Sequence, residues 1–179
     1  MSKVIIIKNL DGTCYITRPA PNMFITDLND IRSRTRVELA EKKILKLDAT
    51  DAEVLEWVRN DVTSKYPNSS SRITDDSNLP NKNSSVDIFR NAWTDDNPTE
   101  TVDVEITRAH QIKKTHFRAL RKPILEKLDV ESMKAVEDNN TALVNAISTK
   151  KQELRDVTLL TLPDDIEQLR SFKPSCLDY

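Results

Sequence analysis

The sequence has very little glycine and cysteine and no long apolar run. Gly12 is the single glycine among 179 residues, so the chain has no glycine-rich loop of the kind that holds phosphate groups. The two cysteines, Cys14 and Cys176, stand near opposite ends of the sequence, which fits a reducing cytoplasm better than a disulfide scaffold. The longest apolar run, residues 4–7, is far too short to cross a bilayer, and we expect no signal peptide.

The chain also lacks a strong excess of charge of either sign. Its net charge is −2, so no overall basic field attracts nucleic acid or an anionic membrane, and we expect neither as a partner. Charged residues make up 31% of the chain and hydrophobic residues 37%. This composition indicates a polar chain with a modest core for its length.

The N-terminal residues have the pattern of a β-hairpin. Residues 3–9 (KVIIIKN) and 13–18 (TCYITR) are β-branched runs on either side of Asp11-Gly12. This arrangement predicts two strands joined by a type I′ turn, in which Gly12 takes a positive φ. Pro19 and Pro21 end the second strand, because proline cannot donate a hydrogen bond to the ladder.

The next segments predict helices and then a linker. Residues 26–47 have apolar side chains at helical spacing. Thr50 and Glu53 have the spacing of a capping box for a helix over residues 51–66, with Pro67 as the stop. Residues 68–85 are rich in serine and asparagine, which by composition alone favours a flexible linker.

The C-terminal part has helical periodicity over most of its length. We expect a helix over residues 103–128, kinked or broken at Pro123, then a short turn over residues 130–138. Asn139 and Asn140 separate these from a helix over residues 141–157, and Pro163 opens a last helix over residues 164–172. Ordered structure should end at residues 173–175. The basic face at residues 113–122 is interpreted as solvated, with phosphate binding as the alternative.

Large apolar side chains on these helices are the candidate packing and partner-docking residues, because two such helices cannot bury their stripes alone. Trp93, which lies before the helices, is added as a core or interface anchor. We expect Phe117, Leu120, Ile124 and Leu154 to form one buried seam. The full set of candidates is Trp93, Ile112, Phe117, Leu120, Ile124, Leu128, Leu143, Ile147 and Leu154.

No cluster of residues points to a reaction. His110 and His116 are six residues apart on one helix and face different directions, so they cannot share a metal. Cys14 is interpreted as a small core residue and Cys176 as an exposed one in a frayed tail. The adjacent carboxylates at 75–76, 95–96 and 164–165 are typical of turns and helix caps. We therefore predict no enzymatic activity, no catalytic residues, no metal and no cofactor.

Five segments of the chain share a pattern with known proteins. They are KVIIIKNLDGTCYITRPAP, SRITDDSNLP, DIFRNAW, VDVEITRAHQIKKTHFRALRKPILEKLDVESMKAVEDNN and AISTKKQELRDVT. Together they resemble a family of small proteins encoded in the tail-gene clusters of tailed phages and prophages. The C-terminal portion is also distantly similar to tail-fibre assembly proteins. The resemblance implies that residues 71–74 form a strand, so that the apparent linker belongs to a small α/β domain.

The predicted fold is α+β. Residues 1–95 form a small domain in which a β-hairpin is extended by a third strand and covered by helices. Residues 103–172 form a helical hairpin or bundle for docking, and residues 173–179 form a tail. From the resemblance we expect a virion- or tail-fibre-associated structural protein in the phage tail, with other tail or tail-fibre proteins or further copies of itself as partners. A tail-fibre assembly chaperone that is not retained in the particle is the alternative, followed by a host-interaction or nucleic-acid-binding protein.

Overall fold

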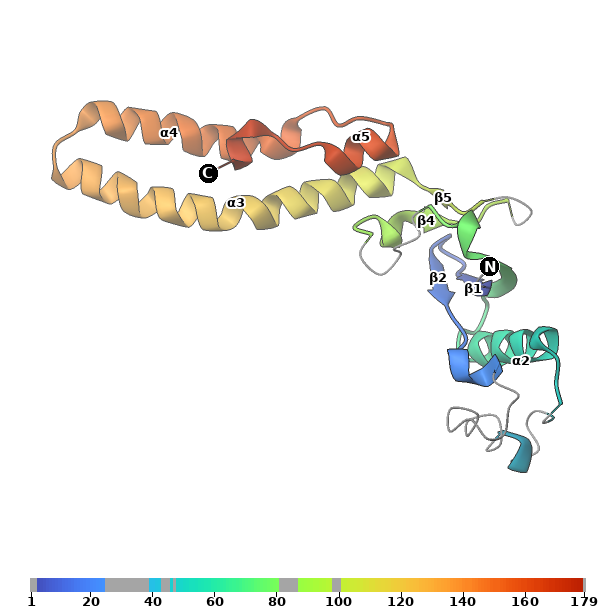
Figure 1. Cartoon of the computed structure of the whole chain (residues 1–179). Coiled ribbons are helices and arrows are strands. Elements are labelled where there is room, and N and C mark those ends of the chain that lie inside the picture. Colours follow the sequence, from blue (N-terminus) through green and yellow to red (C-terminus); the bar gives the residue numbers. More distant parts are fainter. Residues whose placement is uncertain are drawn as a thin grey trace. The chain divides into compact units, whose positions relative to one another are not determined.

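The chain divides into two compact units. The computed structural model describes residues 3–24, 39–42, 46, 48–80, 87–97 and 101–178. Unit 1 spans Met1–Val104 and unit 2 spans Glu105–Tyr179. Unit 1 contains a small sheet with one long helix, and unit 2 is helical, so the predicted α+β class is confirmed (Figure 1). The helix expected over residues 26–47 lies almost entirely outside the described residues.

A three-stranded antiparallel sheet is the centre of unit 1. Strand β1 (Lys3–Lys8) pairs with β2 (Cys14–Thr17) on one side and with β3 (Ser70–Asp75) on the other. The register places Ile6 opposite both Ile16 and Arg72. The hairpin extended by a third strand is therefore present, and the linker interpretation of residues 68–85 is wrong for residues 70–75.

The loop between β1 and β2 differs from the predicted type I′ turn. Gly12 has a φ of 78°, as expected, but Asp11 does not have the positive φ that a type I′ turn also requires. The amide of Gly12 donates to the carbonyl oxygen of Asn9 at 3.1 Å, and the amide of Asn9 donates to the carbonyl oxygen of Thr13 at 2.9 Å. These bonds define a three-residue loop that ends in a left-handed glycine, the next commonest hairpin connection.

Both faces of β1 are covered, which explains its unbroken apolar run. Val4 and Ile6 pack with Leu79, Trp93 and Val102 on one face of the sheet. The alternate side chains of the strand point to the opposite face, because successive residues of a strand do so. There they meet the helix α2 (Asp51–Ser64), as described next.

Helix α2 packs through one side on the second face of the sheet. Val54 and Val58 of α2 lie in one cluster with Ile5 and Ile7 of β1. The helix begins at the predicted capping box: the Glu53 amide donates to the Thr50 hydroxyl, and the Thr50 amide donates to the Glu53 carboxylate at 2.8 Å. The short helix η1 (Pro21–Phe24) follows the end of β2, where the prolines were expected to stop the strand.

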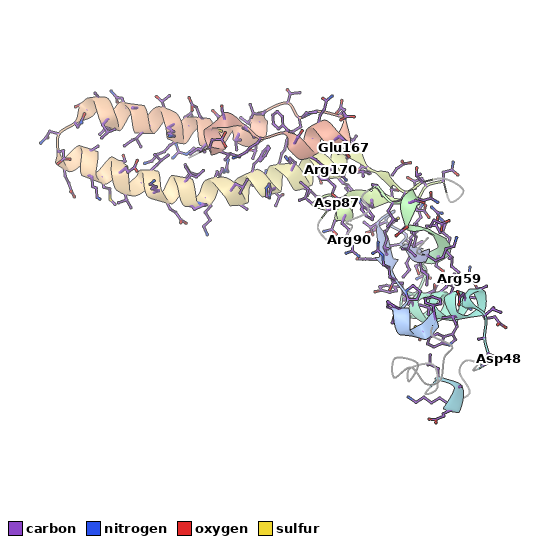
Figure 2. The ribbon with its side chains drawn as sticks, viewed as in Figure 1. Asp48, Arg59, Asp87, Arg90, Glu167 and Arg170 are labelled. Carbon is purple, nitrogen blue, oxygen red and sulfur yellow. The ribbon has the colours of Figure 1, made fainter. Side chains whose placement is uncertain are left out.

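Short elements complete the other face of unit 1. They are η3 (Asp76–Asn78), η4 (Arg90–Ala92) and a two-stranded ladder of β4 (Trp93–Thr94) with β5 (Asp103–Val104). The Trp93 side chain is completely buried, and its Nε1 donates to the buried carboxylate of Asp87 at 3.0 Å. Asp87 and Arg90 are labelled in Figure 2.

The buried carboxylate of Asp95 holds the segment that follows β4 on the three-stranded sheet. Arg72 of β3 makes a two-pronged contact with Asp95, with Nη2–Oδ1 and Nε–Oδ2 distances of 2.6 and 2.8 Å. Lys8 Nζ donates to the Asp95 carbonyl oxygen and to Asp96 Oδ1, at 3.0 and 2.7 Å. The Asp95-Asp96 pair therefore serves as a structural anchor.

Unit 2 is built on a helical hairpin. Helix α3 (Ile106–Glu137) is followed by α4 (Thr141–Asp156), which returns alongside it (Figure 1). The short helices η5 (Val157–Leu159), α5 (Ile166–Ser171) and η6 (Ser175–Leu177) complete the unit. The last predicted helix is thus shorter than residues 164–172, because Asp165 is its N-cap and accepts from the Gln168 amide.

Helix α3 is continuous from residue 106 to residue 137, where the sequence predicted a helix over residues 103–128, kinked or broken at Pro123, and a short turn over residues 130–138. Pro123 lies inside it without ending it. Proline removes the hydrogen bond to the carbonyl four residues earlier, and here that residue, Ala119, is exposed, so water can satisfy the oxygen. The helix ends at the predicted asparagine pair. Asn139 has a φ of 54°, and the Asn140 amide donates to the Ala135 carbonyl oxygen at 2.9 Å, which is a Schellman cap.

Candidate functional site

The contact between α3 and α4 is the core of the helical unit. Phe117, Leu128 and Ala135 of α3 are buried with Ile147 and Leu154 of α4. The phenyl rings of Phe117 and Phe172 lie 6.2 Å apart, so the chain after α5 also packs on α3. The buried residues of α3 between 117 and 135 follow the spacing of an antiparallel helical seam.

The candidate packing residues separate into two groups in the structure. Trp93, Phe117, Leu128, Ile147 and Leu154 are buried. Ile112 and Ile124 are half-buried, whereas Leu120 and Leu143 are 39% and 45% exposed.

The predicted four-residue seam is therefore wrong at Leu120. Arg121 takes the inward position next to it. Its Nη1 donates to the carbonyl oxygens of Leu154 and Arg155 at 3.1 and 2.7 Å. A guanidinium at the carboxyl end of a helix interacts favourably with the helix dipole. Helix α3 thus uses Arg121 to hold the end of α4, and Leu120 stays at the surface.

Lys113 is buried, although the sequence predicted that it lies on a solvated basic face. Its residue exposure is 4%, its Nζ donates to the Arg170 carbonyl oxygen at 2.9 Å, and it lies 5.6 Å from the centre of the Phe117 ring. Burial lowers the pKa of Lys113 below its usual value of 10.5. Arg170, which is labelled with Glu167 on α5 in Figure 2, also pairs with Glu167 at 2.5 Å. Lys113 therefore joins α5 to α3 and is withdrawn from any phosphate ligand.

Large apolar side chains remain exposed near the turn of the hairpin. Val130, Met133 and Val136 of α3 are 48%, 61% and 60% exposed, and Leu143 of α4 lies across the turn from them. We call these four residues the apolar tip. Met133 and Val136 line a shallow hollow beside Lys151, whose Nζ pairs with Asp129 Oδ1 at 2.9 Å. Single exposed apolar residues are common on protein surfaces, and a group of them in one region is a candidate interaction surface.

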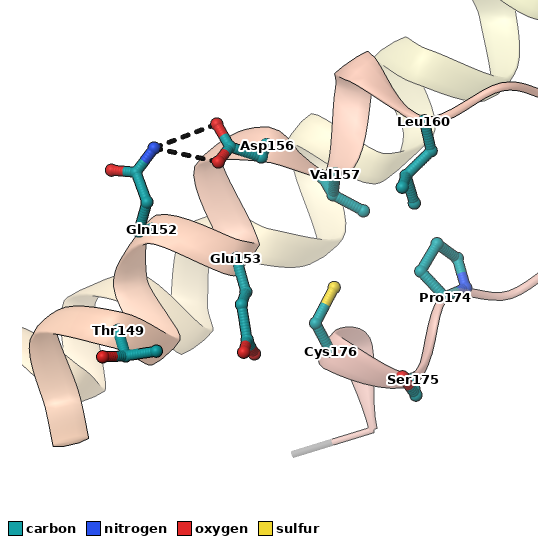
Figure 3. Close-up of a pocket in the computed structure, with 9 residues that line it drawn as sticks. All are labelled: Thr149, Gln152, Glu153, Asp156, Val157, Leu160, Pro174, Ser175 and Cys176. Atoms are coloured by element: carbon teal, nitrogen blue, oxygen red, sulfur yellow. Dashed lines mark hydrogen bonds between the residues drawn. The ribbon is translucent and has the colours of Figure 1, made fainter.

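A second surface feature is a groove between the end of α4 and η6. Its volume is about 530 Å³, and Val157, Leu160 and Pro174 form its apolar part. Glu153 and Asp156 bring carboxylates to it, and Gln152 Nε2 donates to both oxygens of Asp156 at 3.0 and 2.9 Å (Figure 3). The sequence analysis missed this groove, because it expected no ordered structure beyond residue 175.

The cysteines differ in their surroundings. Cys14 is buried in the sheet, as expected, and burial raises the pKa of its thiol to about 11. Cys176 was expected in a frayed tail, but it lies half-buried in η6 at the groove. Burial raises the pKa of Cys176, and the nearby carboxylates of Glu153 and Asp178 add to the effect. A thiol with a raised pKa is a poor nucleophile at neutral pH.

The histidines and paired carboxylates have structural contacts. His110 Nε2 lies 2.9 Å from the Pro163 carbonyl oxygen, and His116 is exposed. Asp75 pairs with Lys3 at 2.9 Å. Within the described part of the chain, no three histidine, cysteine, aspartate or glutamate side chains come together in an arrangement that could hold a metal ion.

Comparisons with known proteins identify no relative. The chain matches no protein-family model, no curated protein and no solved structure. None of the helices that the structure describes is both long and apolar enough to span a membrane.

Proposed function

We propose that the protein is a structural or adaptor component of a bacteriophage tail or tail fibre, and that it acts by protein–protein docking through its helical unit. The observation that carries the docking part is the apolar tip, where four large apolar side chains stay at the surface of the α3–α4 hairpin. The phage part rests on the resemblance of the five sequence segments. The site of action would be the virion, after synthesis in the host cytoplasm.

The exposed area of the tip gives the scale of the interaction. Covering the exposed half of a valine, leucine or methionine side chain contributes roughly 1 kcal/mol. Four such side chains contribute about 4 kcal/mol before the cost of association is subtracted, so one tip binds weakly by itself. Several copies on one particle would bind far more tightly, because linked contacts raise the effective concentration.

The experiment compares tip variants with a variant of an exposed apolar residue outside the tip. Met133→Glu and Val136→Lys place charges on the tip, and Leu10→Lys places one on the β1–β2 loop, where Leu10 is 84% exposed. Each tagged full-length chain is expressed during phage production, and its recovery with tail or tail-fibre proteins is measured. The wild type and Leu10→Lys should be recovered with them, and the two tip variants should not. Equal recovery of all four proteins would refute docking through the tip.

Mass spectrometry of purified particles separates this proposal from a tail-fibre assembly chaperone. A structural protein is present in a fixed ratio to the other tail proteins, whereas a chaperone copurifies from infected cells and is absent from particles. A nucleic-acid-binding function would need the basic face of α3, from which Lys113 is withdrawn by burial. Salt-sensitive retention on DNA or RNA would favour that function over docking.

A further inference from the structure

The side of α3 that faces away from α4 is exposed over residues 118–137. Helix α4 runs along the opposite side, where Phe117, Leu128 and Ala135 are buried (Figure 1). A helix turns by about 100° per residue, so one arc of about 140° on the exposed side collects half of residues 118–137. All residues in this arc are exposed, and we call them the outer face of α3. They are Arg118, Ala119, Lys122, Pro123, Glu126, Asp129, Val130, Met133, Val136 and Glu137.

The charges of the outer face are separated along the helix. Its cations, Arg118 and Lys122, lie in the first half of the face. Its carboxylates, Glu126, Asp129 and Glu137, lie in the second half. Asp129 pairs with a lysine of α4 at 2.9 Å, and the other four charged side chains form no ion pair with a residue that the structure describes. The outer face is therefore positive toward the start of α3 and negative toward its end, and four of its charges are available to a partner.

The outer face also carries apolar side chains beside these charges. Val130, Met133 and Val136, the part of the apolar tip that belongs to α3, lie in its second half. Ala119 and Pro123 lie in its first half and are short. The distance between packed helices depends on the side chains at their contact, so a second helix can approach closely at these two residues. The larger apolar groups of one face can then fit over the shorter groups of a reversed copy.

We infer that the outer face binds the outer face of a second copy of this chain, with the two α3 helices antiparallel. Reversal of one helix places the positive half of each face on the negative half of the other, which a parallel arrangement does not do. With the crossing at Ile124, Lys122 of each copy faces Glu126 of the other, and Val136 faces the half-buried Ile112. No two like charges of the outer face lie directly opposite each other in this register. Copies that dock side by side on one particle would pair in this way, so the pairing rests on the proposed docking function and deepens it.

Sedimentation equilibrium of the purified full-length chain tests the pairing. We expect a reversible equilibrium between a species of 20.5 kDa and one of twice that mass. Arg118→Glu/Lys122→Glu makes the whole outer face acidic and should raise the dissociation constant about tenfold or more, because like charges then face each other. Lys46→Glu/Arg155→Glu reverses two exposed cations outside the outer face and should leave the constant unchanged. A wild type that stays monomeric from micromolar to near-millimolar concentration, or equal constants for the two variants, would overturn the inference.

A mixture of two charge variants tests the complementarity directly. Glu126→Lys/Glu137→Lys places cations in the second half of the face, so it should pair with itself more weakly than the wild type does. Mixed with Arg118→Glu/Lys122→Glu, it should form a one-to-one pair at least as tight as the wild-type pair, because one face is then basic and the other acidic. Two folded variants that do not pair on mixing would refute this charge arrangement. If circular dichroism shows that either variant is unfolded, the crosslinking below decides.

Crosslinking reports the direction of the two helices in otherwise unchanged faces. Cys176→Ser removes one thiol, and the remaining Cys14 is buried, with a pKa raised to about 11. In this background Pro123→Cys places a thiol next to its copy at the crossing. Glu137→Cys places two thiols about 39 Å apart, at about 1.5 Å per residue along antiparallel helices. A short bismaleimide should link the Pro123→Cys chains and not the Glu137→Cys chains, and any other pattern would contradict antiparallel pairing.

The pairing and the docking function can fail separately. A chain that is monomeric alone but is recovered with tail proteins through its tip would support docking and overturn the pairing. A dimer that is not recovered with tail proteins would support the pairing and count against docking. Salt-sensitive retention on DNA that is lost in Arg118→Glu/Lys122→Glu, together with a monomeric chain, would make nucleic acid the occupant of the outer face and overturn the pairing.

Discussion

Three leucines of the helical unit, with different exposures, test whether α3 and α4 pack as the structure describes. Leu154 is completely buried, Leu120 is 39% exposed and Leu159 is 78% exposed. Each is changed to alanine. The substitution is chemically the same at the three positions, so differences in the free energy of unfolding report on the surroundings of each side chain.

The expected sizes follow from the buried fraction. Removing a fully buried leucine side chain to alanine costs about 2–5 kcal/mol, because a cavity is left as well as apolar surface lost. At Leu120 solvent fills the space, so only the transfer term for the buried six-tenths remains, about 1.5 kcal/mol at about 0.8 kcal/mol for each carbon removed. At Leu159 the same reasoning gives about 0.5 kcal/mol. The loss of stability should therefore decrease in the order Leu154 > Leu120 > Leu159.

Urea unfolding followed by far-ultraviolet circular dichroism measures these values in the full chain. The signal comes mainly from unit 2, because α3, α4 and α5 contain 32, 16 and 6 residues, whereas α2 contains 14. A Leu154→Ala variant as stable as the wild type would refute the packing of α4 on α3. If Leu120→Ala lost as much as Leu154→Ala, Leu120 would be covered in solution. Unfolding at several protein concentrations would then show whether a second copy covers it.

Three further predictions concern buried charge and backbone conformation. The folded pKa of Lys113 lies below 10.5, so just below that pH the unfolded chain binds more protons at this side chain and the contribution of Lys113 to stability rises with pH. Urea unfolding at several pH values should show this rise as the difference between the wild type and Lys113→Met, and Lys114→Met should behave as the wild type. The comparison with Lys113→Met is needed because Cys14, with a pKa raised to about 11, changes stability in the opposite direction in alkaline solution. Arg72→Met should lower the free energy of unfolding by about 3–5 kcal/mol, because it leaves the Asp95 carboxylate buried and unpaired. The double variant Arg72→Met/Asp95→Leu should recover most of this loss. Tryptophan fluorescence follows the unfolding, since both tryptophans lie in unit 1. Asn139→Gly should leave the free energy of unfolding unchanged or raise it, because glycine adopts the left-handed conformation of Asn139 without strain. Asn139→Ala should lower it by about 1–2 kcal/mol, because this conformation is unfavourable for alanine. Equal melting temperatures for the two variants would contradict this reason.

Local signals in the sequence predicted the elements that depend on local chemistry. The capping box at Thr50 and Glu53 and the asparagine pair after α3 both mark helix ends in the structure. Each satisfies backbone groups within a few residues, so its effect is visible in a short window of sequence. The strand β3 is different. Its composition indicates a linker. It is ordered by pairing with β1, about 65 residues earlier in the chain, and the composition of a segment does not show whether a distant strand will pair with it.

For Lys113, the helical spacing of the sequence predicts burial correctly, whereas the charge of the residue does not. Ala109, Lys113 and Phe117 are spaced four residues apart, and all three are buried. The spacing alone places Lys113 in the apolar stripe, but its charge led to the opposite assignment. A buried ammonium needs an acceptor, and here the Arg170 carbonyl oxygen supplies it from a helix 57 residues away. Sequence reasoning could predict the face of the helix on which Lys113 lies, and it could not predict that acceptor.

The end of α4 joins the packing of the hairpin to the groove beside it. On the side toward α3, Arg121 donates to the carbonyl oxygens of Leu154 and Arg155 and so offsets the partial negative charge of the helix end. At the same end, Glu153 and Asp156 add negative charge, and Gln152 Nε2 donates to both oxygens of Asp156 (Figure 3). The last turn of α4 also contains Arg155, which is exposed, so this helix end has a cation of its own beside the two carboxylates. Arg121 and Arg155 both bring positive charge to the end of α4, and Arg121 also holds that end on α3 through its two backbone hydrogen bonds.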